Sequence, residues 1–75
     1  MTDTTKKLNI ENFGINLKKL RTQRGITREK MAELLDVSVR IIYDWEDSLK
    51  TPKFERAVEI VLLFNVSFDS MLQLM

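Results

Sequence analysis

The 75-residue sequence contains no cysteine and no histidine. Without cysteine the fold has no disulfide to stabilise it, and thiolate zinc sites are excluded. Without histidine, a catalytic or metal site would lack its commonest general base and its commonest metal ligand. The carboxylates fall on helix faces with no spacing that builds a paired acid–base site. We therefore expect a protein that is not an enzyme, with no catalytic residues, metal, cofactor or small-molecule substrate.

Long apolar runs are also missing. No stretch approaches the roughly 20 apolar residues that a membrane-spanning helix needs, and the chain shows no signal peptide. A chain of this length forms one domain, which buries about 60–65% of the surface exposed by its unfolded form. We expect a soluble, cytoplasmic protein with no membrane partner.

What the sequence does contain is helical periodicity. Residues 1–9 are polar and without periodicity, so they are expected to form a flexible N-terminal arm, with residues 10–75 as the folded domain. Apolar residues then recur at helical spacing in five segments, about 10–24, 28–35, 39–47, 53–64 and 68–74. The sequence therefore predicts an all-α fold.

The segment 27–45 predicts two short helices joined by a tight turn. Thr27 and Ser38 are suited to cap the starts of the two helices, because a hydroxyl can accept an unpaired backbone N–H there. Asp36 is placed to end the first helix in the left-handed conformation, which aspartate tolerates at some cost. Ala32 is small enough to let the two backbones approach closely. Asn65 is expected to end the fourth helix in the left-handed conformation, and Ser67 to cap the start of the last helix.

Helical spacing also predicts which faces are buried. The first helix should bury Ile10, Phe13, Leu17 and Leu20 and expose Lys18, Lys19, Arg21 and Arg24. Gly14 inside this helix suggests close packing against a neighbour. The third helix should bury Ile41, Ile42 and Trp45, and the fourth Phe54, Ala57, Val58, Val61 and Leu62. Leu49, Ile60, Leu63 and Phe64 are then more apolar residues than one face can hide, which suggests a partner.

The residues of the two short helices follow a known pattern. Positions 27–46 carry T-R-x-x-M-A-x-x-L-D-V-S-x-x-x-I-x-x-W-E, and this pattern resembles the lambda-repressor-like, Cro-type helix-turn-helix family. The resemblance extends over about residues 10–74, through the first helix and the starts of the last two. It implies a compact five-helix DNA-binding domain whose helix-turn-helix is formed by the second and third helices.

The resemblance also implies a site and partners. The positions that match the base-reading face of the third helix are Val39, Arg40, Tyr43 and Asp44. Arginine can pair with guanine, valine can contact a thymine methyl and aspartate can accept from cytosine. The positions implied for phosphate contacts are Thr27, Arg28, Lys50, Thr51 and Lys53. The implied partners are double-stranded DNA and, through the C-terminal helices, a second copy of the chain.

Charge is divided unevenly along the chain. Residues 1–30 hold eight Lys or Arg against three acids, whereas residues 31–75 hold four against eight. A basic half suits a polyanionic partner, although helical surfaces are often charged without binding anything. Asp44 and Asp47 place negative charge on the face that would meet DNA, and Lys50 is a candidate to neutralise Asp47.

Two functions follow from these observations. The first is a sequence-specific DNA-binding transcriptional regulator, a small Cro-like repressor that acts by occupying its operator. The alternative is a protein-interaction module on a helix-turn-helix scaffold, antitoxin-like or anti-repressor, with weak or no DNA binding. Asp44, Asp47 and the apolar excess favour the alternative.

Overall fold

The structure, a computed structural model, describes residues 11–73, and this part of the chain is all-helical with no strand. The five helices are α1 (Glu11–Gln23), α2 (Arg28–Leu35), α3 (Val39–Glu46), α4 (Phe54–Phe64) and α5 (Phe68–Leu72). The predicted all-α, five-helix fold is confirmed. α3 ends one residue before its predicted boundary and α4 begins one residue after it. The predicted arm at residues 1–9 lies outside the described residues, as do Ile10, Leu74 and Met75.

Three helix starts are capped as predicted. The hydroxyl oxygens of Thr27, Ser38 and Ser67 accept hydrogen bonds from the backbone N–H three residues ahead, at 3.0, 3.4 and 3.1 Å. Each bond satisfies one of the donors that a helix start leaves without an intrahelical partner. These caps fix where α2, α3 and α5 begin.

A residue with left-handed backbone conformation follows each of the first four helices. Asp36 (φ 57°) ends α2 and Asn65 (φ 56°) ends α4, both as predicted. Gly25, at φ 68°, follows α1, and Ser48, at φ 60°, follows α3. Asp36 and Asn65 each donate a backbone N–H to a carbonyl of the preceding turn. These bonds end α2 and α4 at Asp36 and Asn65.

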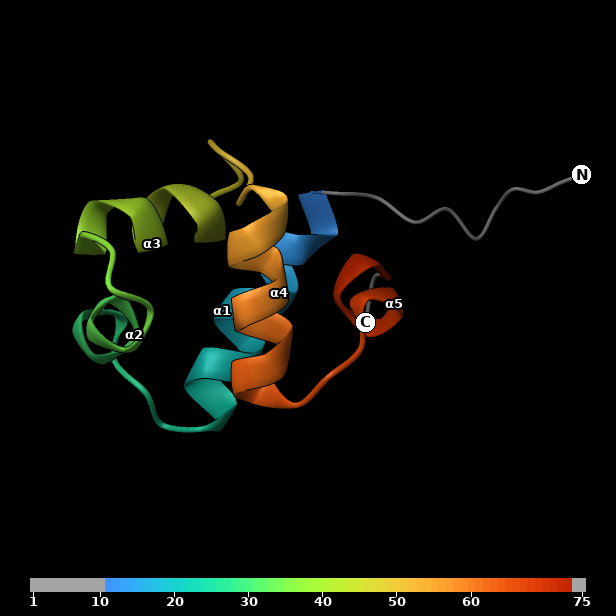
Figure 1. Cartoon of the computed structure of the whole chain (residues 1–75), viewed down its shortest axis with the longest axis horizontal. Helices are drawn as coiled ribbons and strands as arrows, with labels where there is room; N and C mark the ends of the chain where they lie inside the picture. Colours follow the sequence, from blue (N-terminus) through green and yellow to red (C-terminus); the bar gives the residue numbers. More distant parts are fainter. Residues whose placement is uncertain (1–10, 74–75) are drawn as a thin grey trace, which may run out of the picture.

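The core is formed by side chains from all five helices. Figure 1 shows α4 near the middle of the molecule, with α2 and α3 on one side and α5 on the other. The buried apolar side chains come from all five helices: Phe13, Leu17, Met31, Ala32, Leu35, Ile42, Trp45, Ala57, Ile60, Val61, Phe64 and Met71.

α5 is tied to α1 by a buried amide. Asn16 is fully buried, and its Nδ2 donates to the Met71 and Gln73 carbonyls at 2.8 Å each and to the Ser70 carbonyl at 3.2 Å. Asn12 Nδ2 donates to the Leu72 carbonyl at 2.9 Å. Carbonyls at the end of a helix lack intrahelical partners, and here the amides of α1 bond to those of α5. These bonds hold α5 against α1.

The predicted buried face of α4 is partly wrong. Ala57 and Val61 are buried as expected, but Phe54 and Leu62 are each 73% exposed. Ile60 and Phe64, which were assigned to the apolar excess, fill the core instead. The residues spaced by three and four from Ala57 thus form the inner face, and α4 turns a second apolar stripe toward solvent.

Candidate nucleic-acid interface

α3 is held on the domain by its inner side. Ile42 and Trp45 are buried as predicted, whereas Ile41 is only half-buried. Ala32, on the facing side of α2, is also buried. Arg40 and Tyr43 are exposed on the other side of α3, Val39 is half-buried at its start, and Asp47 is exposed directly after its end. The outer side of α3 therefore presents polar and aromatic groups to solvent from a rigid support.

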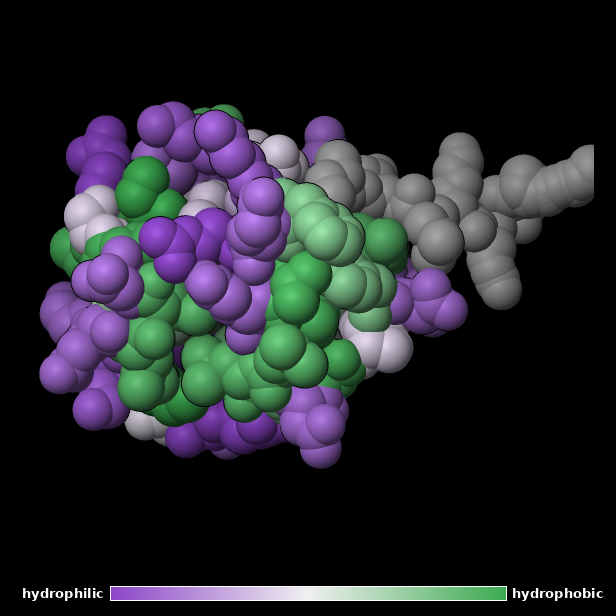
Figure 2. Space-filling model, in the orientation of Figure 1, coloured by the Kyte–Doolittle hydropathy of each residue, from purple (hydrophilic) through white to green (hydrophobic). Residues whose placement is uncertain are grey.

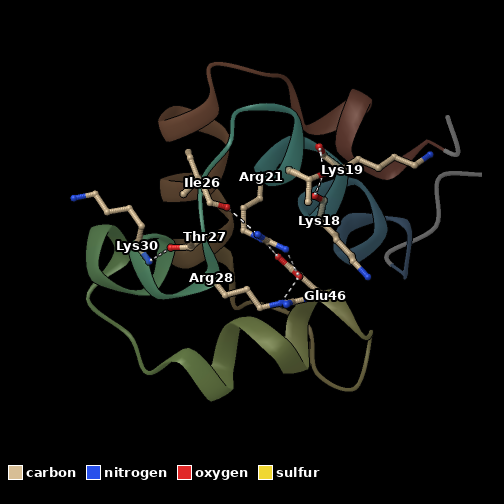
Figure 3. A network of polar contacts seen from close by, with 9 residues as sticks. Lys18, Lys19, Arg21, Ile26, Thr27, Arg28, Lys30 and Glu46 are labelled. Carbon is tan, nitrogen blue, oxygen red and sulfur yellow. Dashed lines mark hydrogen bonds and ion pairs between the residues drawn. The ribbon is translucent and has the colours of Figure 1, made fainter.

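Glu46, at the end of α3, is the centre of a buried ionic network. Its carboxylate is fully buried, and Arg21 Nε of α1 lies 2.6 Å from Oε2. Arg21 also donates from Nη2 to Oε1 at 3.3 Å and from Nη1 to the Ile26 carbonyl at 2.8 Å. Arg28 Nε of α2 donates to Oε1 at 3.0 Å. Figure 3 shows both arginine side chains converging on Glu46. The expectation that Arg21 is exposed is wrong.

Arg28 is held in two ways at the start of α2. Besides its bond to Glu46, its Cζ lies 4.3 Å from the centroid of the Tyr43 ring. Burial opposes the charged form of Arg28, but the hydrogen bond and the charge of Glu46, with smaller contributions from Tyr43, raise its pKa above the ordinary value. Arg28 therefore keeps its positive charge throughout the neutral pH range.

Asp44 faces the same depression as Arg40 and Tyr43 but is covered by its neighbours. It is 7% exposed, and its carboxylate lies between Arg40 Nε, at 3.5 Å, and Lys50 Nζ, at 3.7 Å. The expected exposure of Asp44 is thus wrong. Direct base contact by Asp44 stays a prediction, and it would require Arg40 and Lys50 to move aside. Lys50 pairs with Asp44 rather than with Asp47.

The loop after α3 explains the burial of Asp44. The backbone N–H groups of Leu49 and Lys50 donate to the Asp44 carbonyl at 2.9 and 3.2 Å. This folds the loop back along the end of α3 and brings Lys50 beside the Asp44 side chain. Arg40, Tyr43, Asp44, Asp47 and Leu49 line a shallow depression there.

The remaining predicted site residues flank α3. Thr27 and Arg28 stand at the start of α2, with Thr27 exposed and engaged as the N-cap. Thr51 is exposed in the loop, and Lys53 precedes α4 without a side-chain cap bond. Sequence reasoning missed Glu46, whose role depends on a partner 25 residues away in α1.

The helix-turn-helix family model matches residues 17–71. The chain belongs to the helix-turn-helix family. This confirms the lambda-repressor-like resemblance. A similar solved structure is that of a transcriptional regulator from Listeria innocua, with a TM-score of 0.75 and 27% sequence identity over 80% of this chain. The present chain spans 56% of that protein. The comparison with curated proteins gave no match.

Two other kinds of site are absent from the described residues. Residues 11–73 hold no helix long and apolar enough to cross a membrane. The same residues contain no group of three or more carboxylates that could hold a metal ion.

Proposed function

We propose that the chain acts in the cytoplasm as a sequence-specific DNA-binding transcriptional regulator, with α3 in the major groove. The observation that carries the proposal is the outer side of α3 in a helix-turn-helix chain, where Arg40 is 81% exposed. A guanidinium on such a helix can pair bidentately with guanine. Val39 and Tyr43 are proposed as further base contacts.

Phosphate contacts are proposed around α3. Thr27 and Arg28 lie at the start of α2, where free backbone N–H groups attract a phosphate. Lys50, Thr51 and Lys53 lie between the end of α3 and the start of α4. Contacts of this kind set orientation on the duplex and leave sequence discrimination to the base contacts.

We further propose that the protein represses by occupying an operator as a dimer formed through its C-terminal helices. Phe54 and Phe68 stack with a centroid separation of 6.2 Å, and both rings are exposed. Leu62 and Leu63 of α4 are also exposed. Figure 2 shows hydrophobic residues gathered over α4 on this face. A two-fold pair would present its α3 helices to half-sites about 34 Å apart.

The test of the proposal is duplex binding at two salt concentrations. Fluorescence anisotropy with a random-sequence duplex pool should show binding at about 50 mM salt. The affinity should fall steeply by about 200 mM salt, because phosphate contacts release counterions. Repeated selection from the pool should then enrich one motif. The proposal would be contradicted if the protein bound no duplex at the lower salt concentration, or if selection enriched no motif.

The second candidate is a protein-interaction module. The observation that favours it is an open groove lined by Leu34, Leu62 and Leu63 together with Arg56 and Glu59. The two candidates differ in what Asp47→Lys does at the end of α3. If DNA is the partner, removing an exposed negative charge and adding a positive one should raise duplex affinity several-fold. If a protein is the partner, neither the wild type nor the variant should bind duplex DNA.

A further inference from the structure

Tyr43 is the aromatic residue on the outer side of α3, and a charged neighbour lies against its ring. The guanidinium of Arg28 lies over its ring, with Cζ 4.3 Å from the centroid. A cation over the face of an aromatic ring at this distance is attracted by the charge distribution of the ring. The ring is 41% exposed, so Arg28 covers part of it and leaves the rest facing solvent.

Arg28 itself has little freedom. Its Nε donates to Glu46 Oε1 at 3.0 Å, and the Glu46 side chain has no exposed surface. Arg21 holds the same carboxylate at 2.6 Å from the opposite side (Figure 3). An unbroken series of contacts therefore leads from α1 through Glu46 and Arg28 to the exposed ring on α3. A side chain fixed in this way loses little entropy when it meets a ligand.

We infer that Arg28 is a positioning residue for base recognition, which fixes the orientation in which Tyr43 meets a base. This inference rests on the proposed DNA binding and adds to it which residues determine specificity. It gives Arg28 a role that a phosphate contact does not provide, since phosphate contacts carry no sequence information.

The two roles predict different effects of Arg28→Lys. Lysine keeps the positive charge, so a pure phosphate contact would be largely retained. It loses the extended guanidinium, which bonds to Glu46 through Nε while its Cζ lies over the Tyr43 ring, and a compact ammonium cannot make both contacts in the same way. A positioning role therefore predicts lost discrimination at the base pair that Tyr43 contacts, with little change in affinity for random duplex.

The experiment is a double-mutant cycle on the duplex selected by the wild type. Arg28→Lys, Tyr43→Leu and the double variant are measured by anisotropy against every single-base substitution of that duplex. The single variants should lose about tenfold in discrimination at one shared base pair, and the double variant should lose no more than Tyr43→Leu alone. Lys30→Gln, which removes an exposed positive charge from the same helix, is the control and should leave discrimination at every base pair unchanged.

Several results would overturn the inference. These are full discrimination in Arg28→Lys, a uniform loss over all duplexes, additive effects in the double variant, or unchanged base preference in Tyr43→Leu. In each of these the wild type still selects a site, so the proposed function stands. If the wild type selects no duplex even at low salt, both proposals are overturned together. Thermal melts followed by circular dichroism check that each variant folds. If Arg28→Lys does not fold, Arg28→Gln serves as the second test.

Discussion

Gly14 of α1 lies directly against the backbone carbonyl of Trp45 in α3. A Cβ at this position would collide with the Trp45 oxygen and lie 3.2 Å from Ser48 Oγ. The close packing expected of Gly14 is therefore present, and backbone rather than a flexible side chain forms the contact. Through this contact α1 sets the depth at which α3 sits on the domain.

Gly14→Ala should destabilise the fold by about 1–3 kcal/mol, because a backbone carbonyl cannot move aside as a side chain can. Urea denaturation followed by Trp45 fluorescence measures the change. Gly25→Asn is the matched control, since Gly25 has φ 68° with no neighbour within 4 Å and asparagine tolerates the left-handed region. A Gly14→Ala protein as stable as the wild type would show that α1 and α3 are not in backbone contact.

Glu46→Gln should cost about 3–5 kcal/mol of stability, because it leaves buried Arg21 without its counter-charge. Chemical denaturation at constant pH provides the measurement. Glu33→Gln removes an equal charge from an exposed pair with Lys30 and should cost less than about 1 kcal/mol. Equal effects of the two substitutions would mean that burial adds nothing to the Glu46 network.

Asp36→Gly should stabilise the protein by about 0.5–1 kcal/mol. Asp36 has φ 57°, a conformation that glycine adopts without strain, and its cap bonds use the backbone N–H. A thermal melt measures the gain. Asp47→Gly should give no such gain, since Asp47 has φ −89°. A loss of stability in Asp36→Gly would show that the Asp36 carboxylate contributes to the turn.

Leu62→Glu should shift the protein from dimer to monomer if α4 and α5 form the proposed interface. Analytical ultracentrifugation at several concentrations gives the dissociation constant, and thermal melts check the fold. Leu49→Glu is the matched control, because Leu49 is 72% exposed, close to the 73% of Leu62, but lies after α3. A monomeric wild type, or equal effects of both substitutions, would contradict an interface through the C-terminal helices.

Helix ends were predictable from the sequence because caps are local. Thr27 and Ser38 each bond to an N–H three residues away, and the left-handed turn at Asp36 depends on its own backbone. A residue type at one position is enough to predict such features. The segment boundaries therefore agree with the structure to within a residue at α2 and α3.

The buried face of α4 was less predictable, since this helix carries two apolar stripes. Phe54 and Leu62 are as hydrophobic as Ile60 and Phe64, and both pairs satisfy helical spacing. Which stripe turns inward depends on how α4 docks against the other helices, and this information is not contained in the periodicity of one segment. The structure leaves the Phe54 and Leu62 stripe outside.

Buried charges in the candidate site were the least predictable. Arg21 and Glu46 pair across 25 residues, and neither position differs in type from an exposed surface residue. Asp44 was expected to be exposed from its angle around α3, but the returning loop covers its carboxylate with Lys50. Long-range pairing of this kind appears when the helices are assembled.

The most direct test of DNA recognition by α3 is the affinity of Arg40→Gln for the duplex selected by the wild type. Arg56→Gln is the charge-matched control, since Arg56 lies on α4 beside Glu59 and bonds to the Leu35 carbonyl. If Arg40 reads a base, its loss should weaken the selected duplex about tenfold or more and relax preference at one position, with Arg56→Gln nearly unchanged. Equal, sequence-independent losses in both variants would contradict base recognition through α3.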